Sequence, residues 1–357
     1  MSTSGNRVSP YTSLGISAVW QAVTLISGDI AKLPLNLFEI KDEDQSPEKV
    51  HTHPGWKLVG RRPNQLVEFN VFQFWRRVMV FFLLYNRTWI WIQRDRLGRP
   101  VGLWPLLPSQ TWSQRVYGDE FAALGTEGQL MIHSTVGNQM LTLFPEEVLY
   151  FEGIALDNDE AEIFVNHARE AFGLALAQQQ YASRFFRSGG RIGGILKLPA
   201  EMPKPAKDNL ETGFRKLYES ADAAFKTVVL RDNADFIPGQ HSPEQSQMME
   251  GRREQVREVA RRFNLHPSKL GEEQKTSYGS KAEDNRDYLD TTLSPILCQI
   301  ASEINQKLLT PRQFQSGKFY FAHDTDRMLM LGVGGHRHDR NVRHRGRAGR
   351  PSAHWPL

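Results

Sequence analysis

Cysteine and long apolar runs are the scarcest features of this 357-residue chain. With Cys298 as the only cysteine, neither an intrachain disulfide nor a thiolate metal cluster can form, unlike in disulfide-stapled secreted proteins. The most apolar run, Val78–Tyr85, has eight residues, whereas a transmembrane helix needs ~20. Residues 1–10 are polar and lack the apolar core of a secretory signal. These absences predict a soluble protein of a reducing compartment without a membrane partner.

The composition is otherwise ordinary for a globular chain, because 40% of the residues are hydrophobic and 24% are charged. Disorder over the whole length is therefore excluded. At ~100–200 residues per domain, the length predicts one elaborate body or two to three closely joined lobes.

Positive charge is concentrated at one end of the chain. The 44 basic and 40 acidic residues give a net charge of +4. Gly332–Leu357 contains six arginines and one aspartate, so this tail carries +5 and the preceding 331 residues sum to −1. A basic surface over the whole body, of the kind that grips nucleic acid, is therefore excluded.

Catalytic and cofactor motifs are also missing. The closest approach to a phosphate-binding loop, Gly189–Ile195, has an isoleucine where the phosphate-contacting lysine must stand. Residues 157–160 lack the central glycine and the later glutamate of a calcium loop. Two histidine pairs lack a second pair at zinc-site spacing, namely His51 with His53 and His336 with His338. The sequence therefore predicts no cofactor, no metal and no enzymatic activity.

Apolar periodicity predicts an α+β fold, mixed over the first ~150 residues and mainly helical afterwards. The expected helices are Ser13–Ala31 (with Trp20 in its buried stripe), Val71–Leu84, Ala161–Arg187, Lys207–Tyr218, Glu244–Phe263 and Glu283–Leu309. The expected strands are Pro34–Ile40, a hairpin of Trp89–Gln93 with Val101–Leu107, Leu141–Leu143, Val148–Phe151, Ile195–Leu198, and Thr227–Leu230 with Asp235–Ile237 across a turn. Pro295 is expected to kink the last helix, and Cys298 is expected on its buried side.

Two groups of basic residues are candidates for contact with a polyanion. The arginines of Arg252–Arg262 would contact DNA phosphates, but Glu250, Glu254 and Glu258 interrupt them, which favours a solvated helix with internal ion pairs. Lys269, Lys275 and Lys281 flank a Gly/Ser loop that has fewer cancelling charges. This loop is therefore the better candidate.

Several short sequence blocks, taken in order, resemble the portal protein family of tailed bacteriophages, in particular the long-tailed, non-contractile siphovirus type. The blocks are Ser17–Leu35, His53-Pro54 with Leu58 and Pro63-Asn64, Asn86 with Ile92–Gly98 and Leu103–Leu106, Phe185–Leu196, Glu258–Gly271, and Tyr278–Leu309. Two departures are Tyr85–Thr88, which replaces the family's Gly-Asn-Ala-Tyr, and His266, which replaces one of two prolines.

The resemblance implies a virion protein that forms a ring, usually a dodecamer, at one capsid vertex after assembly in the host cytoplasm. Double-stranded DNA would pass through its channel during packaging and ejection. The terminase large subunit, the major capsid protein, the scaffold and the head–tail connector would bind to it. The chain itself would hydrolyse nothing.

The resemblance also implies a division of the chain. Residues 1–12 would be a flexible N-terminus and 13–205 a wing-like α/β body. Residues 206–263 would form stem helices, Lys207–Tyr218 and Glu244–Phe263, with a small β clip at about 224–240. Residues 264–331 would form a channel loop and a long kinked helix. The residues expected near DNA are Lys269, Lys275, Ser277, Tyr278 and Lys281 in the loop, and Arg252, Arg253, Arg257 and Arg261 in the stem.

Other roles stay open at this point. The tail, residues 332–357, is expected to be disordered, either as the degenerate product of a shifted reading frame in a prophage remnant or as a basic segment that contacts DNA or packaging partners. The chain would alternatively be another structural capsid or connector component, or a metal-dependent nuclease. The acidic residues to test for a nuclease are Asp157, Asp159, Asp324 and Asp326.

Overall fold

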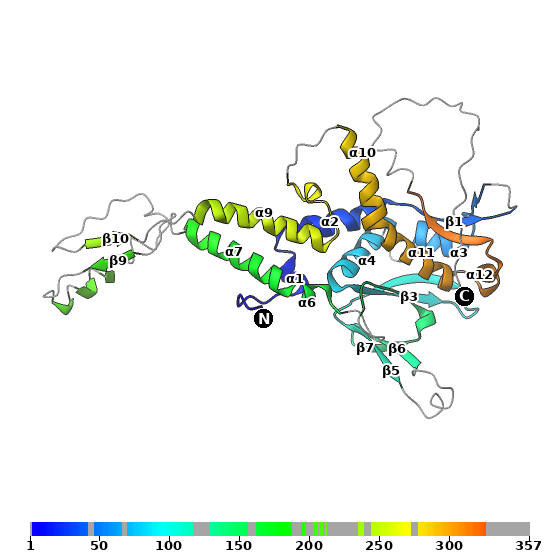
Figure 1. Cartoon of the computed structure of the whole chain (residues 1–357). Coiled ribbons are helices and arrows are strands. Elements are labelled where there is room, and N and C mark those ends of the chain that lie inside the picture. Colours follow the sequence, from blue (N-terminus) through cyan, green and yellow to red (C-terminus); the bar gives the residue numbers. More distant parts are fainter. Residues whose placement is uncertain are drawn as a thin grey trace.

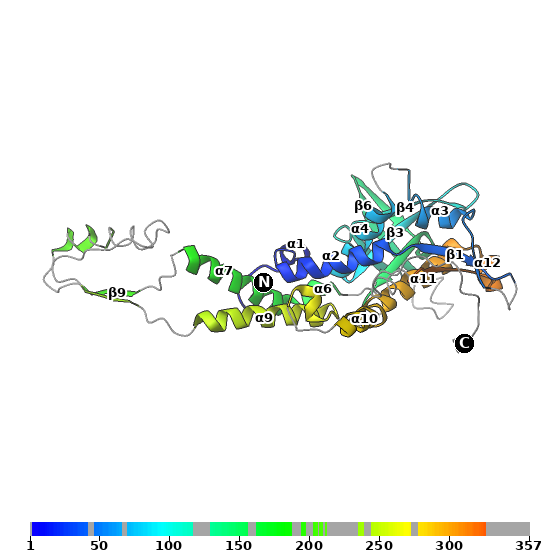
Figure 2. The same ribbon diagram turned by 90° about the horizontal axis from the view of Figure 1, so that it is seen from above.

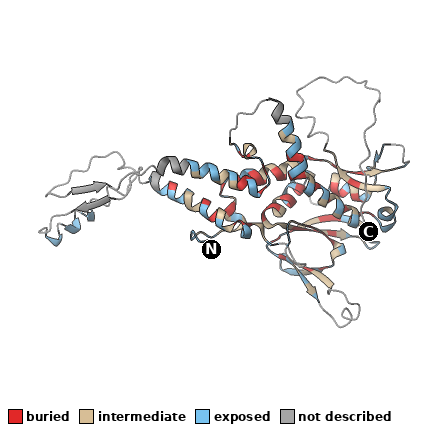
Figure 3. Ribbon diagram, viewed as in Figure 1, coloured by how far each residue is buried: buried red, intermediate tan, exposed pale blue. Residues whose placement is uncertain are grey.

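The computed structural model describes residues 2–41, 46–65, 70–116, 129–155, 162–187, 194–197, 203–205, 207–209, 211–212, 235–238, 244–272 and 278–325. Figure 1 shows an α/β body from which two neighbouring helices extend toward a small two-stranded sheet. Buried residues are concentrated in the body, as the red segments of Figure 3 show.

Two packed helices form the centre of the body. Helix α2 (Ser17–Lys32) follows the short α1 (Pro10–Ser13) and packs against α4 (Val71–Tyr85). Val19, Ile26 and Ile30 lie at the centre of the buried face of α2. Trp20 was expected in this stripe, but it is 58% exposed, because it lies about 100° around the helix from the centre of the buried face.

The end of α4 explains one block of the family resemblance. Asn86 is the helix C-cap with φ 60° in the left-handed region, and its side-chain amide donates to the Ile154 carbonyl at 3.0 Å. Asparagine tolerates this backbone conformation better than most residues. The chain then turns directly from α4 into β3 (Arg87–Arg94).

Two three-stranded antiparallel sheets follow. In the first, β3 lies between β4 (Pro100–Leu106) and β8 (Val148–Glu152). The predicted hairpin is confirmed, since Trp89 pairs with Leu106 and Ile92 with Leu103. The second contains β5 (Thr111–Val116), β6 (Gln129–Val136) and β7 (Gln139–Leu143), and η1 (Pro145–Glu147) leads back to β8.

A third sheet brings together strands from near the beginning and near the end of the described chain. Strand β1 (Leu35–Glu39) lies between β2 (Glu48–Lys49) and β11 (Phe319–His323), and Leu35 pairs with His323. Helices α3 (Pro54–Gly60) and α12 (Pro311–Ser316) lie beside this sheet. Strand β11 was not predicted from the sequence.

A pair of helices extends from the body. Helix α7 (Arg169–Arg187), preceded by the short α6 (Phe164–His167), packs against α9 (Glu244–Arg262), and both views show them side by side (Figures 1 and 2). Beyond them, β9 (Gly194–Lys197) pairs with β10 (Asp235–Pro238). Strand β10 was expected to pair with Thr227–Leu230, which lies outside the described residues; the observed partner is β9.

The long kinked helix has three parts. Helix α10 (Tyr278–Asp287) continues through a π-helical segment, η4 (Tyr288–Leu293), into α11 (Ser294–Leu308). Pro295 lies in the first turn of α11, where its missing N–H and its ring disturb the preceding turn. The predicted distortion is therefore confirmed. The expectation for Cys298 is wrong: the thiol is exposed, because Leu297 and Ile300 occupy the buried face.

We expect Asn86→Ala to lower the free energy of unfolding by about 1–2 kcal/mol, through left-handed strain and the lost hydrogen bond to Ile154. Asn86→Gly keeps the backbone conformation and should cost less. Urea unfolding measures both variants, and an alanine variant as stable as the glycine variant would contradict this explanation.

His323 makes stability depend on pH. Its ring Nδ1 is buried and has no hydrogen-bond partner among the described residues, and burial lowers the pKa of His323 from 6.5 to about 4. The folded state thus favours the neutral ring, so stability is complete above pH ~6.5 and falls as the pH drops toward ~4.

Lowering the pH from 7.5 to 5.0 should therefore cost about 2 kcal/mol through this residue. His323→Phe should remove that part of the loss, and His133→Phe, at a half-buried ring in β6, serves as the control. Urea unfolding at the two pH values checks this. If His323→Phe and the wild type lose the same free energy of unfolding between the two pH values, His323 is not the cause of the pH dependence.

Candidate functional site

Three of the arginines of α9, Arg257, Arg261 and Arg262, form ion pairs with nearby carboxylates. Arg261 donates to Glu254 at 2.7 Å and to Glu258 at 2.9 Å. Hydrogen bonding from Arg261 lowers the pKa of Glu254 below its usual value. Arg257 binds Glu272 with two nitrogens, Nη2 at 2.6 Å and Nε at 3.0 Å from Oε1. The ion-paired helix that the interleaved acids favoured is therefore present.

Other predicted site residues are less constrained. Arg252 and Arg253 are exposed on α9, and neither forms an ion pair with a side chain that the structure describes. Lys275 and Ser277 lie outside the described residues. Tyr278 and Lys281 lie in the first turns of α10. The structure thus places the backbone of these last two at the end of the predicted loop.

Lys269, one of the residues expected near DNA, is half-buried. It lies in η3 (Pro267–Leu270), and its Nζ donates to Asn285 Oδ1 at 3.0 Å. The same ammonium lies 4.5 Å from the centroid of the Tyr288 ring, a cation–π contact. Burial lowers the pKa of Lys269, while nearby Asp29 acts in the opposite direction. The lysine is a half-buried link between η3 and the long helix.

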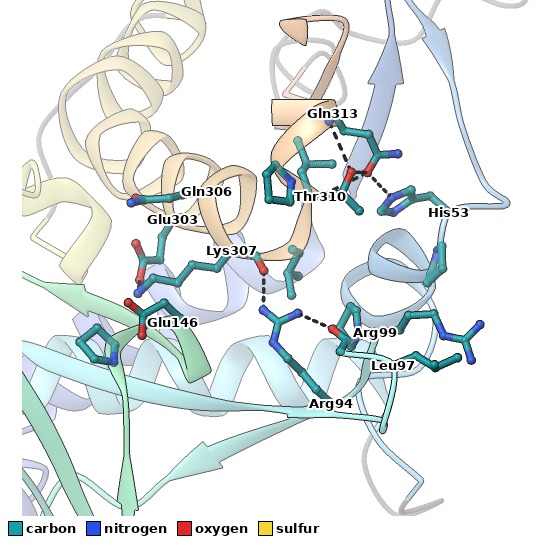
Figure 4. A pocket seen from close by; sticks show the side chains of 17 residues that line it. His53, Arg94, Leu97, Arg99, Glu146, Glu303, Gln306, Lys307, Thr310 and Gln313 are labelled. Carbon is teal, nitrogen blue, oxygen red and sulfur yellow. Dashed lines mark hydrogen bonds and ion pairs between the residues drawn. The ribbon is translucent and has the colours of Figure 1, made fainter. Parts of the chain in front are cut away.

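A cleft lies at the other end of the body, between the β3–β4 hairpin and the end of α11 (Figure 4). Its volume is about 840 Å³. Arg94 donates to the Lys307 carbonyl at 2.8 Å and to the Gly98 carbonyl at 3.0 Å. His53 contacts Gln313 at 3.2 Å through Nε2 and accepts from the Gly55 N–H through Nδ1. These polar side chains hold helix ends and a turn, which is a structural role.

A smaller cleft of about 370 Å³ adjoins the first and shares Glu303 and Lys307 with it. Glu303 forms an ion pair with Lys307 and accepts from the Tyr150 N–H at 2.8 Å. Neither cleft was predicted from the sequence, because the lining residues come from elements that are far apart in the chain.

Of the four carboxylates proposed for a nuclease, the structure describes Asp324 alone. Asp324 is 2.9 Å from Lys49, whereas Asp157, Asp159 and Asp326 lie outside the described residues. Over the part of the chain that the structure describes, there is no group of three or more side chains suited to hold a metal ion. Within the same part, no helix is long and apolar enough to span a membrane.

The family model for phage portal proteins matches residues 17–332 of this chain. The chain belongs to the phage portal protein family. The probable portal protein of Streptomyces phage phiC31 is 28% identical over 327 residues, which cover 89% of this chain and 70% of the relative. The portal protein of Enterobacteria phage HK97 is 24% identical over 322 residues, covering 88% and 72%.

Solved portal structures have the same fold. A crystal structure of an HK97-family phage portal protein from Corynebacterium diphtheriae superimposes with a TM-score of 0.64 at 16% identity, covering 90% of this chain and 97% of the other. A chain in the neck of an empty gene transfer agent particle gives a TM-score of 0.63 at 18% identity, covering 94% and 92%. The predicted family and the mixed α/β portal fold are thus confirmed.

Membership in the portal family makes the chain a structural component of a virion and not an enzyme. The family match ends at residue 332, where the basic tail begins. The tail lies outside the described residues, so both hypotheses for it stay open.

Proposed function

We propose that this portal protein assembles with copies of itself into a ring, a dodecamer, through which double-stranded DNA passes during packaging and ejection. Family membership supports this proposal, as does the likeness to a chain in the neck of a gene transfer agent particle computed with C12 symmetry (TM-score 0.57, 17% identity, 92% of this chain and 89% of that one). The proposed location is the portal vertex of the capsid, reached after assembly in the host cytoplasm.

The observation that carries the proposal is the low net charge of the body. Each phosphate that a protein neutralises releases counterions and strengthens binding, so a strongly cationic channel would hold DNA instead of letting it pass. Residues 1–331 carry a net charge of −1. Arg257 and Arg261 form ion pairs with carboxylates of the protein itself. In α10 and η4, Glu283, Asp287 and Asp290 are exposed at spacings that place them on one face.

The structure leads us to assign the parts of the portal differently from the sequence. Because α9 packs against α7, we propose α7 and α9 as the stem and assign β9, β10 and the chain between them to the clip. Helical residues 207–209 and 211–212 lie near β9 (Figure 1), so they fit the clip better than the stem. The remaining α/β body would be the wing, and residues 271–280 the channel loop.

The partners follow from this assignment. We propose that the clip end binds the terminase large subunit during packaging and the head–tail connector afterwards, and that the wing contacts the major capsid protein and the scaffold. Among the candidate residues, Lys275, Ser277, Tyr278 and Lys281 would lie closest to DNA, and Arg252 and Arg253 would line the stem.

Native mass spectrometry of the purified chain tests the ring. We expect a closed particle of about a dozen subunits, as head-to-tail contacts that close on themselves require. A monomer that persists at micromolar concentration would contradict the proposal, and a different closed subunit number would correct the dodecamer alone.

Replacing both Lys275 and Lys281 with alanine should alter the amount of DNA packaged per capsid while ring formation stays intact. Arg312→Ala with Lys318→Ala removes the same charge at exposed positions around α12, and it should leave packaging unchanged. Quantitative DNA measurement on purified capsids gives the answer. Equal packaging in both double variants would remove the loop lysines from the mechanism.

A further inference from the structure

Two groups of contacts lie on either side of residues 273–277. The first group fixes the position of Glu272, the residue that precedes this segment. Glu272 follows η3, and its side chain is 14% exposed. Arg257 of α9 approaches Glu272 in the bidentate arrangement described above, with Nε also 3.2 Å from Oε2. Bidentate arginine–carboxylate pairs fix orientation as well as distance. The start of the loop is therefore tied to the stem helix.

The second set holds the other end of the loop. Lys269 lies three residues before Glu272, yet its side chain contacts Asn285 and Tyr288 after the loop. A single side chain therefore bridges the two ends of the loop.

Both residues of this bridge, Lys269 and Tyr288, form hydrogen bonds with side chains of α2. The Tyr288 hydroxyl donates to Asp29 Oδ2 at 3.1 Å, and Asp29 also pairs with Lys32 at 2.6 Å. Gln21 donates to the Lys269 carbonyl at 3.0 Å. Burial raises the pKa of the Tyr288 phenol, so this group stays a hydrogen-bond donor at neutral pH. Helix α2 belongs to the main core of the body, which makes it a rigid support.

We propose that Arg257 and Lys269 are positioning residues that set the separation and direction of the two ends of the channel loop, and that they do so without contacting DNA. We name the set Arg257, Glu272, Lys269, Asn285 and Tyr288 the loop mount. The proposal rests on the proposed function only for the statement that the loop meets DNA. The mount itself is a property of the protein alone.

A distance measurement in the assembled protein without DNA tests the mount. The native, exposed Cys298 and Ser277→Cys each carry a spin label, and an excess of unlabelled Cys298→Ser subunits isolates single label pairs within a ring. Double electron–electron resonance spectroscopy then gives the width of the distribution of distances between the two labels.

We expect Arg257→Glu and Glu272→Arg each to widen this distribution about 1.5-fold or more, because like charges then face each other across the mount. Combining both exchanges restores an opposite pair and should return the width to that of the parent. Arg253→Glu makes the same charge change on an exposed face of α9 and should have no effect. Unchanged widths in the single variants, or no recovery in the double variant, would overturn the proposal for Arg257.

Lys269 is tested in the same way. Lys269→Met keeps the length of the side chain but loses the charge and its hydrogen bond, so it should widen the distribution, and Lys269→Arg should recover much of the loss. Equal widths for Lys269→Met and the parent would refute its role.

Packaging measurements separate this proposal from the proposed function. A Lys269→Met variant with a widened distribution and reduced packaging supports both. A widened distribution with normal packaging would leave the mount intact and contradict the role of the loop in DNA passage.

Discussion

The burial of helix α2 is the constraint on which the other parts of this portal protein depend. Val19, Ile26 and Ile30 are at most 2% exposed, and each such side chain contributes ~1.5–3 kcal/mol when fully buried. The helix packs on α4, contacts α9 and η3, and continues into β1, which pairs with β11. One apolar face therefore sets the places of α4, α9 and η3 relative to one another.

Electrostatics decides what the assembled surface can do. Most arginines of α9 have carboxylate partners on the same helix or at the start of the loop, and exposed acids follow on α10. Solvent-exposed ion pairs of this kind add little stability. Their consequence is functional, because paired arginines are less available to bind phosphates. In the proposed channel, a duplex would therefore move past this surface with little resistance.

Local patterns predicted much of this fold. The periodicity of α2 and α9, the turn between β3 and β4, and the proline of the long helix each act within a few residues, so the sequence reveals them. The exposed Trp20 and Cys298 were misplaced because periodicity locates a buried face only to within about one residue position. The partners of α9 and of β10 depend on contacts between distant segments, which no single-sequence pattern encodes.

The candidate site was predictable only in part, for the same reason. The interleaved acids of α9 correctly indicated ion pairs. The position of Lys269 in the chain indicated an exposed loop residue, but its partners Asn285 and Tyr288 follow 16 and 19 residues later, and Asp29 near Tyr288 belongs to a helix at the other end of the chain. The sequence shows which residues are charged. The distant groups that neutralise them can be identified only once the fold is known.

We propose that the body of this portal surrounds DNA without gripping it. The most direct test is the salt dependence of duplex binding to the assembled ring, measured on a chain that ends at Leu331 so that the arginines of the tail do not contribute. We expect weak binding, and a plot of log K against log salt concentration whose slope has a magnitude below about 3. Tight binding with a slope of about 6 to 10, the value expected for a surface that neutralises many phosphates, would contradict it.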